Sequence, residues 1–594
     1  MTEKVTSQTP PILHGPSEKD RKYDRQLRLW AASGQAALEE ANILLLNSGA
    51  GTVGVETLKN LILPGIGRFS IADDASVSDA DLGVNFFLQE SSRGKPRSQC
   101  CAELLLELNP EVQGTWQTLN QSSEALGEYL ESSPIYTMIL YTFPVRPEYQ
   151  ALLETYSRQH KTPVVAIHSA GLYSYFQITL PGAFPIVETH PDETATTDLR
   201  LLAPWPELEQ FAQELTKDVD NLDDHDHGHL PYVAILLHYL GKWRDLHDGT
   251  NPTTYAEKTA FRRMVQDATR RDNPEVGEEN FDEAVAAVLK TVTPASLPAG
   301  LREVFQYEHA EPTEQKSVFW VIADAVKQFY DKHKCLPVPG SVPDMKAQSK
   351  VYVQLQNIYK AKARKDAGEV LELVRTTPAG HGVDPAQVEL FCKNAAFVKL
   401  VNATRAARSP SEAMDRLRRV AESEFRNDET AEALMTPFSL LPIYLALQAT
   451  SHVASATETD MLAEITKMVP GAAENERVIK CVREVARAEG GELHNISALT
   501  GGMVAQEVIK VITKQYVPID NTCIFDGISS RCQMKSGRLG SRLISATAFR
   551  LPRLGSRPRS CVAEVVVELM SEDVVITSML LSDVAIRPRL WGGR

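Results

Sequence analysis

A glycine-rich turn between a buried strand and a helix is the feature that most constrains this fold. Residues 42–47 form a short apolar run, which is typical of a strand buried on both faces. Apolar residues at helical spacing follow, and residues 68–72 read as a second strand. Between the first strand and the helix, three glycines match Gly-x-Gly-x-x-Gly: Gly49, Gly51 and Gly54. This order predicts a doubly wound α/β domain.

The glycine turn and a following acid together indicate a nucleotide-binding site. Glycines let the backbone approach a phosphate at the positive end of a helix, and an acid about 20 residues later can hold a ribose hydroxyl. Asp73, at the end of the second strand, lies at that distance from Gly54. The alternative is that the glycines only permit tight packing of the strand against the helix. An NAD-dependent oxidoreductase using these residues is therefore one hypothesis, although no hydride-transfer constellation follows.

The rest of the chain alternates between this sheet pattern and a long helical stretch. Further strands are expected at 135–141 and 164–167, with helices at 97–108 and 148–159. Apolar stripes at helical spacing predict a mostly α-helical insertion, after which the chain returns to the sheet domain. The expected organisation is a flexible N-terminus (1–21), a first sheet part (22–181), the insertion (182–487), a second sheet part (488–530) and a basic extension (531–594).

A long helix expected at 494–513 contains an unusual glycine pair. Gly501 and Gly502 would each cost about 1 kcal/mol relative to alanine inside a helix. Close backbone packing against another element or another subunit would compensate for that cost. We therefore expect an interface on this helix at Gly501, Gly502 and Gln506.

Composition excludes several classes of protein. The formal net charge of −15 argues against a general nucleic-acid binder, which must neutralise phosphates with basic residues, so no nucleic-acid partner is expected. No apolar run reaches the roughly 18 residues of a membrane helix, and the first 20 residues contain no secretory signal. Eight scattered cysteines indicate reduced thiols and a cytoplasmic or nuclear location.

Several separate blocks resemble one adenylation half of the activating enzymes for ubiquitin-like proteins. These blocks are residues 22–27 (KYDRQL), the glycine turn as far as residue 60, the end of the strand at Asp73, 501–510 (GGMVAQEVIK) and 521–526 (NTCIFD). Within the insertion, four short blocks are similar to the regulatory subunits of neddylation-activating enzymes: 190–193, 198–202, 343–345 and 355–359. The resemblance implies a pseudo-adenylation domain with an insertion like a catalytic-cysteine domain.

The resemblance also implies that this half does not catalyse adenylation. Where active members have Asn and Arg that help to bind ATP, this chain has Gly83 and Val84. The phosphate-neutralising Lys corresponds to Arg97, or to Lys95 in an alternative alignment. The alcohol-binding Asp-Asn has no counterpart in residues 141–144. Losing one charge-stabilising contact costs about 10²–10³ in rate, so a homodimeric enzyme active by itself is the less favoured alternative.

The family implies a role in trans for Arg25. In the family, an Arg in this motif reaches across the subunit interface to the ATP phosphates of the partner, where a guanidinium binds oxygens bidentately. The alternative is a surface Arg paired with Asp24 or Glu39. By the same resemblance, the chain has no cofactor of its own, and a catalytic subunit binds ATP and magnesium. The other expected partners are a Nedd/Rub-type modifier and, transiently, a conjugating enzyme.

Cysteine and histidine residues suggest no catalytic or metal site in this chain. Cys335 has nearby cations, but it does not match the family's nucleophile block, whereas Cys100, Cys101, Cys392 and Cys481 read as core residues. The nucleophile is expected on the partner. The tract from Asp223 to His229 is rich in Asp and His, but we expect a solvated or capping loop with no metal. The extension 531–594 holds ten Arg and one Lys against five acids, and we expect little fixed structure there.

Overall fold

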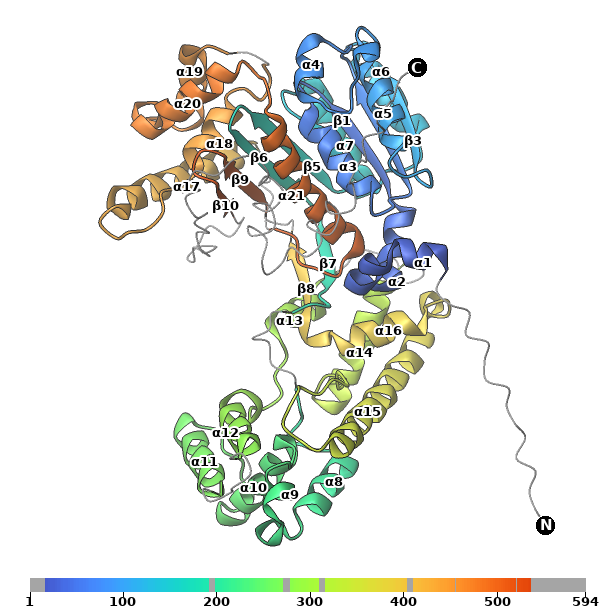
Figure 1. Cartoon of the computed structure of the whole chain (residues 1–594), viewed down its shortest axis with the longest axis vertical. Coiled ribbons are helices and arrows are strands. Elements are labelled where there is room, and N and C mark those ends of the chain that lie inside the picture. The colour runs from blue at the N-terminus through green and yellow to red at the C-terminus, as the bar shows by residue number, and fades with distance from the viewer. Residues whose placement is uncertain are drawn as a thin grey trace, which may run out of the picture. The chain divides into compact units, whose positions relative to one another are not determined.

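A computed structural model describes residues 17–191, 198–270, 278–308, 316–402, 410–453, 456–519 and 521–535. The described residues form two compact units, one drawn from 1–184 and 401–594 and the other from 185–400. The strands β7 (Ala183–Val187) and β8 (Val398–Asn402) pair in a two-stranded sheet where the chain passes between the units. Figure 1 shows the elements of both units.

An eight-stranded sheet organises the first unit, in the order β10-β9-β6-β5-β4-β1-β2-β3. The strands β5, β4, β1, β2 and β3 are parallel, whereas β6, β9 and β10 are antiparallel to their neighbours. The central strands are buried on both faces, as their continuous apolar runs predict. The strand bounds are β1 Asn42–Asn47, β2 Arg68–Asp73, β3 Gln113–Thr118, β4 Met138–Thr142, β5 Val164–Ala170, β6 Tyr173–Thr179, β9 Thr522–Asp526 and β10 Arg531–Lys535.

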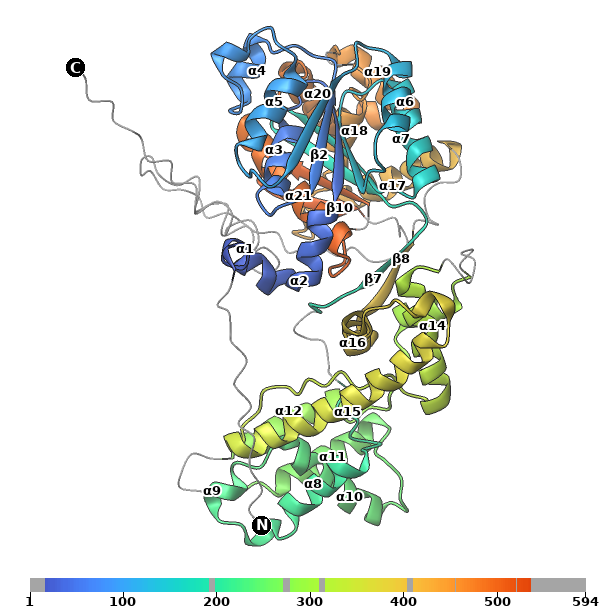
Figure 2. The same cartoon turned by 90° about the vertical axis from the view of Figure 1, so that its right-hand side faces the viewer.

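Helices cover both faces of this sheet (Figure 2). One face carries α3 (Thr52–Ile62), α5 (Arg97–Leu106) and α21 (His494–Thr513), and α21 packs directly on α3. The other face carries α6 (Ser123–Ser132) and α7 (Pro147–His160), which share a hydrophobic core with the strands. The doubly wound α/β fold predicted from the glycine turn is therefore confirmed.

The helices between residues 410 and 488 pack on the sheet, which differs from the insertion expected at 182–487. Buried side chains of four helices join the core beneath α6 and α7: α17 (Pro410–Ala431), α18 (Leu441–Gln448), α19 (Glu458–Met468) and α20 (Glu476–Ala488). Helical periodicity shows that one face of a helix is buried, but not which partner buries it. The pattern therefore could not separate these helices from those of the other unit.

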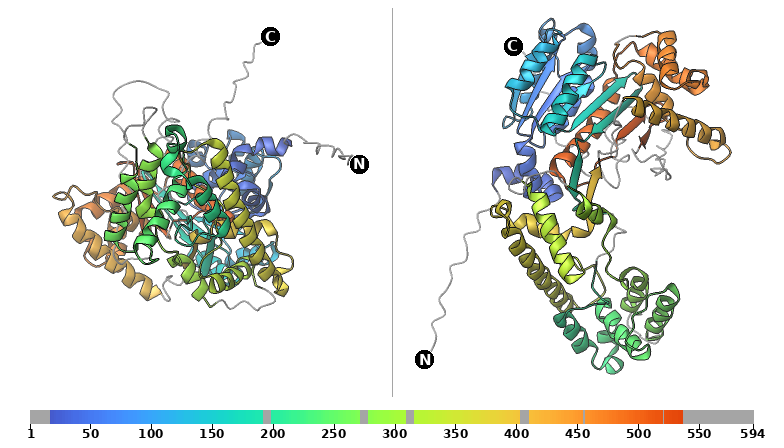
Figure 3. Two further views of the ribbon diagram at one scale, coloured as in Figure 1. Left: turned by 90° about the horizontal axis from the view of Figure 1, so that it is seen from below. Right: turned by 180° about the vertical axis from the view of Figure 1, so that it is seen from behind.

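The second unit is built from helices, as the apolar stripes predict (Figure 3). One hydrophobic core of this unit is formed by α8, α10, α11, α12 and the 27-residue α15. The bounds are α8 Pro206–Thr216, α9 Asp224–His227, α10 Tyr232–Leu246, α11 Tyr255–Asp267, α12 Glu279–Thr291, α13 Ala299–Gln306, α14 Val318–His333, α15 Ser349–Arg375 and α16 Pro385–Lys393. Among the helices of the described ranges, none is both long and apolar enough to cross a membrane.

Both ends of the described chain are more ordered than expected. Ser17 caps α1 (Glu18–Lys22) in a capping box with Asp20, inside the segment 1–21 that was expected to be flexible. Residues 531–535 form β10, although they were assigned to the extension 531–594. The rest of that extension, from residue 536, lies outside the described residues.

Candidate functional site

The glycine turn has the backbone geometry of a nucleotide-binding loop. Gly49 and Gly51 adopt φ values of +62° and +66°, which disfavour side chains, and α3 starts directly after Gly51. Gly54 faces the strand: an added Cβ would lie 2.8 Å from Asn47 Oδ1 and 2.9 Å from Leu45 Cδ1. The glycines therefore serve both hypotheses, since they shape the loop and also permit tight packing.

Asp73, the expected ribose-binding acid, has no capacity left for a ribose. Its Oδ1 accepts from the Ala75 amide at 2.8 Å and from Arg97 Nη2 at 3.1 Å. Its Oδ2 accepts from Asn47 Nδ2 at 3.0 Å and from Arg97 Nε at 2.8 Å. A carboxylate offers about four lone-pair positions, and Asp73 uses four hydrogen bonds while only 1% exposed. Asp73 therefore lies at the predicted position, but its carboxylate binds groups of its own chain.

Arg97 occupies the space beside the glycine loop. Besides the bidentate pair with Asp73, Arg97 Nη1 donates to the carbonyl oxygens of Gly49 at 2.8 Å and Ala50 at 3.1 Å. The same nitrogen lies 2.8 Å from Asp81 Oδ1. Burial lowers the pKa of Arg97, but Asp73 and Asp81 more than offset this and raise it above its ordinary value. Lys95, the alternative in the alignment, is exposed.

Asp81 completes this cluster and was not singled out from the sequence. It lies on α4 (Asp79–Val84), where Ser78 and Asp81 form a capping box. Burial raises its pKa, but hydrogen bonds from Ser78 and the charge of Arg97 outweigh burial and hold the pKa below its usual value. Gly83 is exposed with open space around it, and Val84 is half-buried at the end of the helix. Neither residue can supply a cation to this loop.

Glu492 is the second residue of this site that sequence reasoning missed. It lies two residues before α21, and its Oε2 accepts from the Val53 amide at 2.8 Å and from Ser497 Oγ at 2.6 Å. Burial raises its pKa to about 7, although these hydrogen bonds, the Gly51 amide and the Arg97 charge act in the opposite direction. A buried carboxylate thus lies at the positive end of α3.

Arg25 lies on the exposed side of α2 (Asp24–Glu40), outside the glycine-loop cluster. The two acids considered as its alternative partners are engaged elsewhere: Asp24 pairs with Arg28 at 3.0 Å, and Glu39 pairs with Lys19 at 2.7 Å. Within the described residues, no hydrogen bond or ion pair of Arg25 is found. Its guanidinium is therefore available to a ligand outside this chain.

The glycine pair of α21 packs against the helix of the glycine loop. A Cβ at Gly501 would lie 2.8 Å from the Thr57 amide nitrogen and 2.9 Å from Glu56 Cβ, so only glycine allows this approach. Gly502 and Gln506 are buried. Packing inside the chain accounts for Gly501, and a subunit interface at these three residues stays a prediction.

Burial disfavours the thiolate of three cysteines in the described ranges, whereas the hydrogen bond with Cys523 lowers the pKa of the exposed Cys532 on β10. Burial raises the pKa of Cys101 and Cys392 to about 12 and that of Cys481 to about 11, which disfavours the thiolate. Cys100 is buried, as expected, while Cys481 is half-buried, and Cys335 is half-buried in a loop after α14. That the nucleophile belongs to another subunit stays a prediction.

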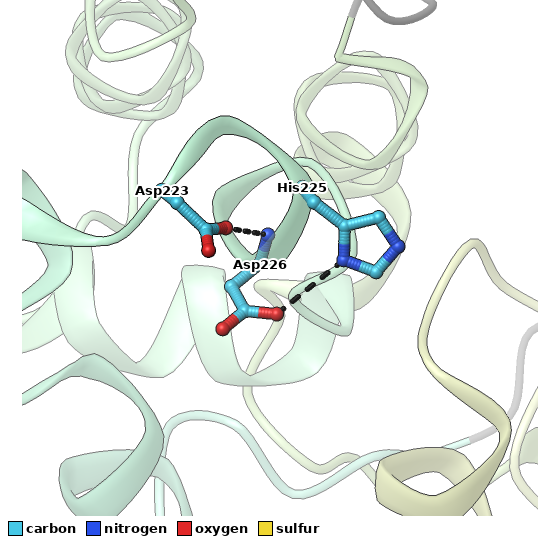
Figure 4. Close-up of side chains that lie close together, drawn as sticks. All are labelled: Asp223, His225 and Asp226. Carbon is cyan, nitrogen blue, oxygen red and sulfur yellow. Dashed lines mark hydrogen bonds and ion pairs between the residues drawn. The ribbon is translucent and has the colours of Figure 1, made fainter.

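The Asp- and His-rich tract forms a capped short helix (Figure 4). Asp223 Oδ1 accepts from the Asp226 amide at 2.7 Å and so caps α9, as expected. Asp223, His225 and Asp226 are exposed, with potential ligand atoms within 4.8 Å of one another, but Asp226 also accepts from Gln348 at 2.7 Å. His227 differs from a solvated loop residue, because it is buried and bonded to Glu278 at 2.5 Å.

Comparison with known sequences identifies the family of this domain. The sequence model of the ThiF family matches residues 23–540, so the fold and the glycine-loop site define a ThiF-type domain. The crystal structure of E. coli MccB with AMPCPP and MccA is a remote match, with 18% identity, a TM-score of 0.25 and coverage of 28% of this chain and 51% of that one.

Curated relatives are similar over nearly their whole length. The NEDD8-activating enzyme E1 regulatory subunit of Danio rerio is 34% identical over 86% of this chain and 98% of its own length. The corresponding subunit of Gallus gallus is 34% identical, over 86% and 97%, and AXR1 of Arabidopsis thaliana is 31% identical, over 87% and 96%. The chain belongs to the family of NEDD8-activating enzyme E1 regulatory subunits.

Proposed function

We propose that this chain is the regulatory subunit of a heterodimeric enzyme that activates a NEDD8-type modifier. A catalytic partner would bind ATP and magnesium, adenylate the modifier and receive it as a thioester on its own cysteine. A conjugating enzyme would then take the modifier in a transient complex. The names of the relatives support a role in NEDD8 activation. Because Arg97 fills the glycine loop of this chain, we place ATP binding and catalysis on the partner.

One observation carries this proposal: Asp73 is saturated by groups of its own chain. Both carboxylate oxygens already accept two hydrogen bonds, one of each pair from Arg97. A nucleotide ribose would have to displace a buried, doubly bonded guanidinium, and charged hydrogen bonds of this kind are among the strongest in proteins. The same saturation argues against an NAD-dependent oxidoreductase and against an adenylating enzyme that acts alone.

Arg25 is the residue through which this chain would act on the partner's nucleotide. It is exposed, its neighbouring acids pair with other cations, and a guanidinium fits phosphate oxygens bidentately. Adenylation depends mainly on positioning and on stabilisation of developing negative charge, so an added cation increases the rate.

The test compares Arg25→Ala with Arg28→Ala in the reconstituted heterodimer. Arg28 lies on the same helix, is more than two-thirds exposed and pairs only with Asp24 among the ion pairs of the described residues. We expect Arg25→Ala to lower the rate of modifier-dependent ATP–pyrophosphate exchange about 10²-fold, and Arg28→Ala to leave it unchanged. Equal rates for both variants and the wild type would remove the role in trans.

A further inference from the structure

The N-terminus of α3 is built to bind an anion. The first amides of a helix have no intrahelical acceptor, and the helix dipole places positive charge there. In folds of this class, that position receives the phosphate of a nucleotide. Here the α3 N-terminus directly follows Gly51, whose left-handed conformation turns the chain into the helix.

Glu492 supplies an anion at this position from within the chain. Its carboxylate accepts from the Val53 amide, the second residue of α3, at 2.8 Å. The residue is 4% exposed, so its carboxylate is not a solvated surface group. Glu492 lies 439 residues from Val53 along the chain, so this hydrogen bond forms only when the second sheet part folds against the first.

The segment that presents Glu492 is fixed on both sides. A β-bridge joins Glu492 to Gly171 at the end of β5, where the Gly171 amide donates to the Gly491 carbonyl at 2.9 Å. On the other side, Ser497 in the first turns of α21 holds the same carboxylate oxygen at 2.6 Å. Because the backbone of Glu492 is fixed by the β-bridge and its carboxylate by Ser497, little conformational entropy is lost when the carboxylate binds the α3 amide.

We infer that Glu492 is an internal phosphate mimic, which occupies the anion position of the glycine loop and closes it to nucleotides. Arg97 complements it, because the guanidinium satisfies the carbonyl oxygens of Gly49 and Ala50 while the carboxylate satisfies the α3 amide. The Val53 amide and the carbonyl oxygens of Gly49 and Ala50 thus have partners within the chain. This inference deepens the proposed function and rests on it for the statement that nucleotide binds elsewhere.

The test asks whether removing the carboxylate creates a phosphate site. The full-length chain and its Glu492→Ala variant are melted in increasing inorganic phosphate, with ionic strength held constant by chloride. The matched control is Glu476→Ala, which removes an exposed glutamate of α20. We expect a Tm rise of about 3 °C or more for Glu492→Ala alone when phosphate reaches roughly ten times its Kd. The wild type and the control should show only the smaller, common effect of phosphate on proteins.

The result that overturns the inference is a phosphate response of Glu492→Ala equal to that of the wild type. If Glu492→Ala does not fold, Glu492→Ser is melted in the same way, and the same equality overturns the inference. Failure of the proposed function is a separate result. Phosphate binding is read on this chain alone, whereas the proposed function fails if a catalytic subunit and this chain together form no thioester with the modifier.

Discussion

Replacing Arg97 with alanine tests whether the filled loop stabilises the fold. The guanidinium is 3% exposed and makes five hydrogen bonds, to both oxygens of Asp73, to Asp81 and to two loop carbonyls. The variant leaves two buried carboxyl groups without their cation. Removing one partner of a buried ion pair costs about 3–5 kcal/mol. For a unit larger than about 250 residues, each kcal/mol lowers Tm by about 2 °C, so a decrease of roughly 6–10 °C is expected.

The matched control is Arg93→Ala, and the assay is thermal unfolding of the full-length chain followed by circular dichroism. Arg93 lies four residues earlier and pairs with Asp79 and Glu90, but it is half exposed, so its ion pairs contribute about 0–1 kcal/mol. We expect Arg93→Ala to melt within about 2 °C of the wild type. Equal melting of Arg97→Ala and Arg93→Ala would refute the reasoning.

The pH dependence provides a second readout of the same cluster. In the wild type, the lowered pKa of Asp81 contributes stability above its unfolded-state pKa, and this contribution is lost as pH falls through the folded-state pKa. In Arg97→Ala, burial favours the protonated form of Asp81, so the folded state binds more protons than the unfolded state. The deficit of the variant should therefore shrink as pH falls towards the unfolded-state pKa of Asp81. A deficit that grows on acidification would contradict this account.

Three further predictions concern single residues. Because burial raises the pKa of Glu492 to about 7, the contribution of Glu492 to stability should fall by roughly 3 kcal/mol as pH rises from about 4.5 to 7. Urea unfolding of Glu492→Gln should lack this part of the pH dependence, and a profile equal to that of the wild type would contradict the prediction. Gly501→Ala should lower Tm because its Cβ would lie 2.8 Å from the Thr57 amide nitrogen. The control Gly241→Ala in α10, which has open space around it, should raise stability by up to about 1 kcal/mol, and a lower Tm for Gly241→Ala alone would contradict the packing argument. Asp223→Ala should lower the free energy of unfolding by about 1 kcal/mol because the α9 cap is lost, and Asp223→Asn should lower it much less. Urea unfolding measures both variants, and equal losses of stability would argue against capping.

The local pattern of the sequence was sufficient to predict the first sheet part. The apolar run before Gly49 and the left-handed glycines follow from short-range rules, and β1, α3 and β2 occur where those rules place them. Asp73 also lies at the end of its strand, as predicted. What the pattern could not show is which groups Asp73 binds, since its partner Arg97 lies 24 residues away at the start of α5.

Long-range contacts account for the parts that the sequence did not predict. Glu492 precedes a helix like many surface acids, and only the folded chain brings it to the Val53 amide. The helices of residues 410–488 have ordinary amphipathic patterns, which could not distinguish packing on the sheet from packing in the other unit. The capping box of Ser17 and Asp20 was a local signal for α1, and that of Ser78 and Asp81 was one for α4.

Modifier-dependent ATP–pyrophosphate exchange tests the central claim most directly, when it is measured for this chain alone, for a catalytic subunit alone and for the two together. With the ribose acid and the anion position both filled from inside, this polypeptide should give no exchange by itself and should raise the rate of the catalytic subunit on mixing. Exchange by the isolated chain, accompanied by an adenylated modifier, would contradict the account.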